Sequence, residues 1–412
     1  MAPRKRQRKN NPRAPLASRM LPADLLLAIA ARSDARTIIR CGATCKTLRR
    51  EIADASFIRQ AATAGVVPTR ILLAYTRRYR RRNHRRKPFI SLVHPATPVA
   101  LCFADKHLVP FVARSAAGDL LGRYDPVTSR RGLIVLVRRH YIHEHRNSDL
   151  CVYDPMTGDR TFLSKPLGIS FDRSCIGCPC QPCVLLTATD GLSGSSFLLF
   201  FARRAWCEVK GTNSMRIQTA ALSDNGNVSW GPVTEHFGAP LGNHHDEHDD
   251  AVVLPGGVIH WLQNGRHILT YDVLTRKLGT VELPFMPTNN KPVQRHLRMS
   301  PDWRLRFLVA DVFMITMWIQ LPGGHGWERE VVIDMEEKLR LFEPNVPLGS
   351  MSIQFKRSGE RTGAVMLRIH GQRCVLIVLD LETKEIRRQH LNPSLLFEVD
   401  LSERLQGMKI FS

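Results

Sequence analysis

One hairpin motif, repeated at long intervals, constrains the fold of this chain more than any other feature. In residues 152–158, 270–276 and 378–384 an apolar strand ends at an aspartate, and residues 332–337 form a looser copy. The carboxylate of an aspartate can accept a hydrogen bond from the backbone two residues further on, which starts a turn into a second strand. From a further hairpin at Asp224, successive copies lie 48, 62 and 46 residues apart. Since a four-stranded propeller blade repeats at roughly 40–50 residues, this spacing predicts blades.

The chain beyond residue 88 is built from short strand-like segments, and long helical periodicity is missing. Apolar runs bounded by turn residues occur at 132–137, 196–201, 257–262, 305–309 and 374–379. At that repeat length, residues 88–412 would form about six or seven blades. We therefore predict an α+β multidomain chain in which a small helical module precedes a mainly antiparallel all-β domain. That domain is expected to be an irregular six-bladed β-propeller, within a range of five to eight blades, and a large β-sandwich or barrel is the alternative.

Residues 20–65 carry the periodicity of short amphipathic helices instead. Pro22 suits a first helical position, and Asp34 and Thr44 can cap a second and a third helix. A fourth helix would contain Phe57 and end at Gly65. A module of this size buries too little surface to be stable alone, so we expect it to lean on a neighbouring domain or a partner.

The order of residues in this module resembles an F-box. The matching features are an opening Leu-Pro at Leu21 and Pro22, a leucine-rich first helix, a Cys-Lys-x-x-Arg pattern from Cys45, and a closing Phe57. Leu48 departs from the family, which very often has Trp there. The resemblance implies a module that docks onto a Skp-type linker protein and so joins a cullin–RING ubiquitin ligase. The implied contact positions are Leu21, Pro22, Leu25, Leu26, Ile29, Ile38, Ile39, Cys45, Lys46, Leu48 and Ile52. The alternative is that these residues form a helical core against the C-terminal domain.

A second resemblance concerns the β domain. Residues 256–284 are similar to the blades of plant F-box-associated domains, and the whole chain is similar to the grass F-box proteins. This resemblance implies that the β domain holds a protein substrate, which the sequence does not identify.

The net charge of +22 raises the question of an acidic partner. Most of the surplus lies in two runs without acidic residues, 1–19 and 77–87. The first is expected to be a disordered basic arm, and 66–87 is expected to be a basic linker. The arm has the composition of a nuclear-import signal at Arg4, Lys5, Arg6, Arg8 and Lys9. Direct nucleic-acid binding by both runs is an alternative function, but we do not favour it.

Two clusters carry residue types that bind metals. Cys175, Cys178, Cys180 and Cys183 could close a tetrahedral zinc site, although zinc ribbons separate their two pairs by a longer loop, so a loop before a strand is favoured. Residues 244–250 mix His with Asp and Glu. Adjacent residues of an extended chain point to opposite faces, so a solvated acidic loop is favoured there too. We therefore expect no metal and no cofactor.

The chain contains none of the phosphate-loop, nucleophile-elbow or zinc-protease motifs of common enzymes. No run approaches the about eighteen apolar residues that a membrane span needs. The sequence therefore favours a soluble intracellular protein, in the nucleus, the cytoplasm or both, that binds other proteins without catalysing a reaction. The expected role is substrate recognition within an SCF-type E3 ubiquitin ligase, and a scaffold outside any ligase remains an alternative.

Overall fold

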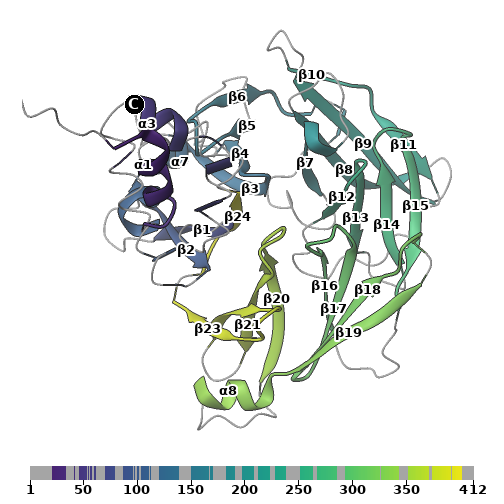
Figure 1. Cartoon of the computed structure of the whole chain (residues 1–412). Coiled ribbons are helices and arrows are strands. Elements are labelled where there is room, and N and C mark those ends of the chain that lie inside the picture. Colours follow the sequence, from purple (N-terminus) through teal and green to yellow (C-terminus); the bar gives the residue numbers. More distant parts are fainter. Residues whose placement is uncertain are drawn as a thin grey trace, which may run out of the picture.

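The computed structural model of the chain describes six antiparallel β-sheets set around a central axis, with a few short helices (Figure 1). The residues described are 21–33, 41, 46–52, 54, 56–57, 60–61, 70–78, 87–95, 97, 100–101, 104–110, 112, 120–138, 150–166, 168–169, 182–190, 197–207, 212–222, 228–237, 251–262, 267–284, 293–324, 326–342, 351–370, 374–390 and 392–400. This arrangement is a six-bladed β-propeller. The predicted propeller is therefore confirmed, and the alternative of a β-sandwich or barrel is wrong.

Five of the six blades run outward from the axis in chain order. The first contains β3 (Tyr124–Arg130), β4 (Leu133–Arg138), β5 (Leu150–Tyr153) and β6 (Arg160–Leu163). The second contains β7 (Cys183–Thr187), β8 (Phe197–Cys207), β9 (Thr212–Leu222) and β10 (Val228–Trp230), with β11 (Thr234–Phe237) also paired to β9. The third contains β12 (Val252–Leu254), β13 (Val258–Leu262), β14 (His267–Asp272) and β15 (Lys277–Glu282). The fourth contains β16 (Gln294–Met299), β17 (Leu305–Asp311), β18 (Met314–Gln320) and β19 (Trp327–Asp334). The fifth contains β20 (Ser352–Ser358), β21 (Ala364–His370), β22 (Val375–Asp380) and β23 (Ile386–Gln389).

The sixth blade joins the two ends of the chain. Its strands, in order from the axis, are β24 (Leu395–Asp400), β1 (Arg70–Arg78) and β2 (Lys87–His94). β1 pairs antiparallel with β24, and Arg70 Nε donates a hydrogen bond to Asp400 Oδ2 over 3.2 Å. The sequence prediction placed residues 66–87 in a linker, whereas the structure places β1 there. The propeller therefore begins well before residue 88.

Six apolar clusters fill the six gaps between successive blades. Phe307 and Leu297 belong to the cluster between the third and fourth blades, and Ile315 and Leu367 to the cluster between the fourth and fifth. Each sheet is therefore covered on both faces, which is why strands such as β22 are continuous apolar runs without alternation.

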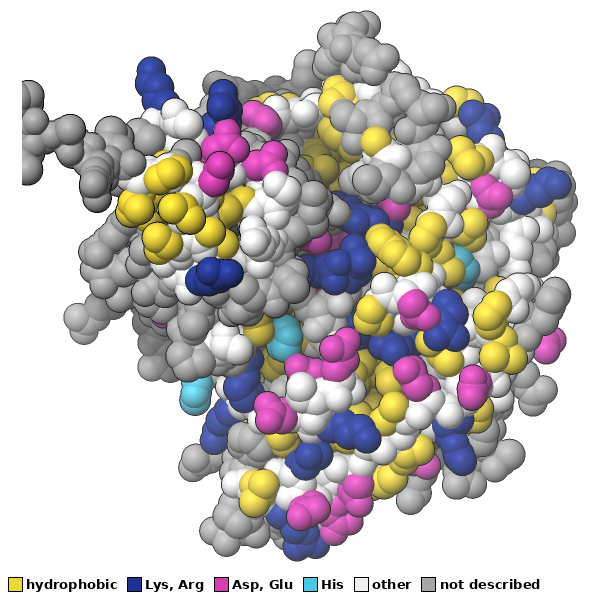
Figure 2. Space-filling view, in the orientation of Figure 1, with side chains coloured by type: hydrophobic (Ala, Val, Ile, Leu, Met, Phe, Trp, Pro, Cys, Tyr) yellow, Lys and Arg dark blue, Asp and Glu magenta, His cyan; other side chains and the backbone are white. Residues whose placement is uncertain are grey.

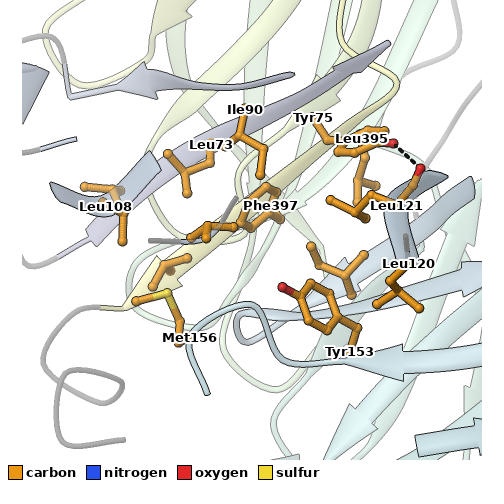
Figure 3. Packing of buried hydrophobic residues seen from close by; sticks show 14 of the residues in the cluster. Leu73, Tyr75, Ile90, Leu108, Leu120, Leu121, Tyr153, Met156, Leu395 and Phe397 are labelled. Atoms are coloured by element: carbon orange, nitrogen blue, oxygen red, sulfur yellow. Dashed lines mark hydrogen bonds between the residues drawn. The ribbon is translucent and has the colours of Figure 1, made fainter. Parts of the chain in front are cut away.

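The helical segments pack beside the closing blade. α1 (Ala23–Ala30) contacts α3 (Lys46–Ile52), and both contribute to the cluster between the sixth and first blades. Figure 3 shows this cluster, in which the Tyr75 hydroxyl donates to the Leu121 carbonyl over 3.3 Å. Further helical segments include η1 (Ala104–Leu108), α7 (Leu120–Arg123), η2 (Ala188–Asp190) and α8 (Glu336–Phe342). The module thus leans on the propeller, as its small size predicts. Asp34 and Thr44, expected to cap helices, lie outside the described residues.

The repeated aspartates occupy one structural position in three blades. Asp154, Asp272 and Asp380 stand between the third and fourth strands, and each carboxylate accepts a backbone N–H from two residues further on over 2.8–2.9 Å. Asp334 is different, because it ends the outermost strand β19 and accepts the N–H of Glu336 at the start of α8. The looser fourth copy is therefore a helix start and not a hairpin. The turn at Asp224 lies outside the described residues, although β9 and β10 do form a hairpin.

Candidate functional site

The first candidate surface is an apolar stripe on α1. Pro22 precedes the helix with φ −51° and ψ 143°, and its carbonyl accepts the N–H groups of Leu25 and Leu26, each over 3.1 Å. Leucine and alanine, which fill the helix, are strong helix formers. Leu21, Leu25 and Ile29 follow one another at intervals of four residues and are 52%, 52% and 55% exposed. Because residues four apart lie on the same side of a helix, Leu25 and Ile29 form one apolar face of α1 on the solvent side, and the exposed Leu21 lies just before the helix.

The opposite side of α1 packs inward. Ala30 is buried, and Leu27 is partly buried against the cluster between the sixth and first blades. The helix is therefore anchored to the propeller through one side, and its other side, which is also apolar, remains about half exposed to solvent. Figure 2 shows hydrophobic side chains gathered on the surface of the helical region.

The other expected adaptor contacts differ in position. Pro22 and Lys46 are exposed and Leu26 is half-buried. Leu48 packs against the interblade cluster and Ile52 is 3% exposed within it. Ile52 therefore packs the helical module against the propeller in this structure, and its contact with an adaptor stays a prediction. Ile38, Ile39 and Cys45 lie outside the described residues.

Most residues of the predicted nuclear-import and metal clusters also lie outside the described residues. These are Arg4, Lys5, Arg6, Arg8, Lys9, Cys175, Cys178, Cys180 and residues 244–250. Cys183 begins β7, and burial raises the pKa of its thiol, which opposes formation of the thiolate that zinc binds. Within the described part of the chain, no group of three or more Cys, His, Asp or Glu side chains could hold a metal ion. No helix among those residues is long and apolar enough to cross a membrane.

The second candidate surface is the central channel. The inner strands of the six blades line a cavity of about 70 Å³ that opens to solvent. Each inner strand is paired on one side only, so its other edge turns backbone N–H and C=O groups toward the axis. The walls combine apolar side chains with Arg130, Arg298, Arg357, Glu360 and Glu398. In Figure 2, dark blue Lys and Arg side chains gather around the central hollow.

A buried ionic network crosses one part of this channel. The guanidinium of Arg130, at the end of β3, donates through Nε and Nη2 to both carboxylate oxygens of Asp190. Its Nη1 lies 3.8 Å from Oε2 of Glu360, while the other oxygen of Glu360 accepts the Arg131 N–H over 2.8 Å. Burial raises the pKa of Glu360 to about 7, against the opposing effect of Arg130. The network ties the first, second and fifth blades together across the axis.

Three neighbouring loops add a stacked group. The guanidinium carbons of Arg131 and Arg361 lie 4.7 Å and 4.2 Å from the ring centre of Trp303. Arg131 and Trp303 have positive φ values of 51° and 67°, a backbone region that non-glycine residues rarely adopt.

The channel residues were not found by sequence reasoning. Arg298 is a charged residue within the strand of residues 294–299, where a neighbour such as Leu297 is buried. A charged residue next to buried apolar residues in a strand is the one feature of the sequence that could have pointed to Arg298. The pairing of Arg130 with Asp190 and Glu360 had no local signal, because those residues meet only when the ring closes.

Comparison with known proteins identifies the family of the domain. A family model described as "Domain of unknown function (DUF7595)" matches residues 96–411. No curated protein matches the chain. Among solved structures, the chain is similar to a protein from Lactobacillus plantarum at 10% identity and a TM-score of 0.37, covering 79% of this chain and 82% of that one. It is also similar to the fungal six-bladed β-propeller lectin of Aleuria aurantia at 12% identity and a TM-score of 0.30, covering 66% and 78%. Similarities of this size carry no argument about function.

Proposed function

The chain belongs to the DUF7595 family of domains of unknown function, and we propose that it is the substrate-recognition subunit of an SCF-type E3 ubiquitin ligase. The family match begins at residue 96, so it leaves the helical module outside it. In this proposal the helical module binds a Skp-type adaptor, and through it a cullin–RING assembly, while the propeller binds a protein substrate. The chain itself makes and breaks no bond, and it acts by holding the substrate near the ubiquitin-conjugating enzyme.

The exposed stripe of Leu21, Leu25 and Ile29 is the observation that carries the proposal. These three residues are among the contact positions that the F-box resemblance implies. Leu25 and Ile29 lie on the exposed side of α1, and the exposed Leu21 precedes the helix. Covering the exposed halves of three such side chains would contribute on the order of 3 kcal/mol to binding. An apolar helix face of this kind suits a partner that packs its own helices against it.

The propeller supports the second half of the proposal. A β-propeller is a rigid scaffold that presents loops from several blades at each end of its channel, and such a fold is suited to protein binding. The packing of α3 against the closing blade would hold the adaptor-binding helices at a fixed position relative to those loops. A fixed geometry matters for a ligase subunit, because the substrate lysine must reach the conjugating enzyme.

A single substitution on α1 tests the adaptor contact. We expect Leu25→Asp to abolish co-purification of the full chain with a Skp-type adaptor, because a carboxylate would be buried in an apolar interface without a partner. Leu341→Asp is the matched control, since Leu341 is also an exposed leucine on a helix, α8, but lies on a different blade. That control variant should capture the adaptor as well as the unchanged chain does.

Two outcomes of this experiment would contradict the proposed role in a ligase. Undiminished adaptor capture by Leu25→Asp would remove the basis of the proposal. Capture of the adaptor without a cullin would instead identify a scaffold outside any ligase. A point variant is preferable to deleting the helices, because deletion would expose the cluster in which Ile52 is buried.

A further inference from the structure

We propose that the central channel contains a binding site for the oxyanion group of a small molecule, a carboxylate or a phosphate, built around Arg298. The site is separate from the α1 face, so it stands or falls independently of the proposed ligase role. Arg298 lies on β16, the inner strand of the fourth blade, and lines the channel cavity.

The guanidinium of Arg298 has donors that nothing in the described part of the chain satisfies. The residue is 1% exposed, and both Nη1 and Nη2 are buried without a hydrogen-bond partner. Only Nε has one, a long contact of 3.4 Å to the carbonyl of Met299. A buried charged group without a partner is strongly unfavourable, so an arrangement of this kind calls for an anion.

The acidic groups whose charges act on Arg298 are Glu398, Glu382 and Asp380, and among the described residues none of them forms a hydrogen bond with its guanidinium. Glu398 instead accepts the backbone N–H groups of Arg361 and Thr362 over 2.8 Å and 2.9 Å, and Asp380 accepts those of Glu382 and Thr383 over 2.9 Å and 3.1 Å. Burial also raises the pKa of Glu398. Arg298 itself stays protonated, because burial, together with the charge of Arg306, lowers its pKa only to about 10.

The surroundings of Arg298 define the class of ligand. The planar guanidinium fork matches the two oxygens of a carboxylate or a phosphate. The unpaired edges of the inner strands supply further N–H donors toward the axis. Leu72, Val184 and Val253 make part of the wall apolar. The cavity therefore suits a small molecule with an anionic head and a compact apolar body.

Titration calorimetry of the full chain tests this site, with inorganic phosphate and succinate as separate probes at constant ionic strength. We expect saturable binding of at least one probe, and a loss of about tenfold or more in affinity for Arg298→Met, which keeps an apolar stem but removes the charge. Phosphate binding alone would identify a phosphate ligand, and succinate binding alone a carboxylate. Arg329→Met, at an exposed arginine on outer strand β19 of the same blade, should leave affinity unchanged.

A second measurement does not depend on the variant folding. Crystals of the full chain soaked with selenate, a tetrahedral oxyanion, should show its anomalous signal within hydrogen-bond distance of the Arg298 nitrogens. Absence of saturable binding by both probes would overturn the proposal. An equal affinity for folded Arg298→Met, or a selenate signal only elsewhere on the molecule, would overturn it as well.

Discussion

The hairpins between the third and fourth strands show how one residue position can carry backbone strain. The fourth residue after the turn aspartate has positive φ in all three blades: Gly158 at 83°, Arg276 at 55° and Lys384 at 59°. The left-handed region costs an L-residue roughly 1–2 kcal/mol, whereas glycine enters it freely. The turn therefore tolerates a non-glycine residue at this position in two blades, at the expense of stability.

Glycine-to-alanine substitutions test this interpretation, because they should change the free energy of unfolding in opposite directions at strained and unstrained positions. We expect Gly158→Ala to lower the free energy of unfolding by about 1 kcal/mol, because alanine must adopt the left-handed conformation. The control, Gly122→Ala, places the same change in helix α7 with nothing within 4 Å of the new Cβ. There alanine should raise the free energy of unfolding by about 0.5–1 kcal/mol. Urea denaturation measures both, and shifts of the same sign would contradict the strain argument.

Glu360 gives the channel a predictable pH dependence. Its pKa is raised to about 7 in the folded chain, mainly by burial, so the folded protein resists an ionisation that the unfolded chain undergoes at about pH 4.3. This group therefore lowers stability progressively as pH rises from about 4 to about 7, and the loss is constant above that range.

The substitution Glu360→Gln should remove this dependence, since glutamine retains an oxygen acceptor for the Arg131 N–H. Urea midpoints of the variant minus those of the unchanged chain should become more positive between pH 4 and pH 8. Glu336→Gln, which alters the exposed Glu336–Arg340 pair of α8, should show little change across the same range. A flat difference for both variants would contradict the burial of an ionised Glu360.

At the scale of elements, local sequence patterns predicted where most strands lie but not which position each strand takes within its blade. The aspartates at 154, 272 and 380 were predicted correctly, because an aspartate turn is formed by residues within one hairpin. Asp334 shares the local pattern but follows a fourth strand, and sequence periodicity alone does not distinguish a third strand from a fourth. β1 was hidden by the basic run beginning at Arg77, although Ile71 to Tyr75 is an apolar strand sequence.

The two candidate surfaces differ in how far the sequence could predict them. The exposed face of Leu25 and Ile29 was predictable, because helical spacing places residues four apart on one side, whereas Leu21 precedes the helix. That Ile52 faces inward depends on where α3 meets the propeller, which helical spacing does not state. The channel network could not be predicted, since Arg130 and Glu360 are 230 residues apart in the sequence. Only the closed ring brings them within 3.8 Å.

At the scale of the whole molecule, the sixth blade closes the ring with strands from opposite ends of the chain. The pairing of β24 with β1 extends from Arg70 opposite Asp400 to Tyr75 opposite Leu395. Phe397 is buried in the cluster that also holds α1 and α3, and Glu398 accepts hydrogen bonds from the loop between β20 and β21. One short strand therefore connects the helical module, the first blade and the fifth.

Removal of this strand should affect the entire propeller. We expect a chain ending at residue 394 to lose its cooperative thermal unfolding transition, because β1 would lack its inner partner and apolar side chains of two interblade clusters would face solvent. A chain ending at residue 400 is the control, since it retains every described contact. Calorimetry should show an unfolding enthalpy near that of the full chain for the control and a much smaller one for the shorter chain. Equal enthalpies and midpoints would mean that five blades unfold as a unit without closure, and the ring would then owe its stability to the contacts between neighbouring blades alone.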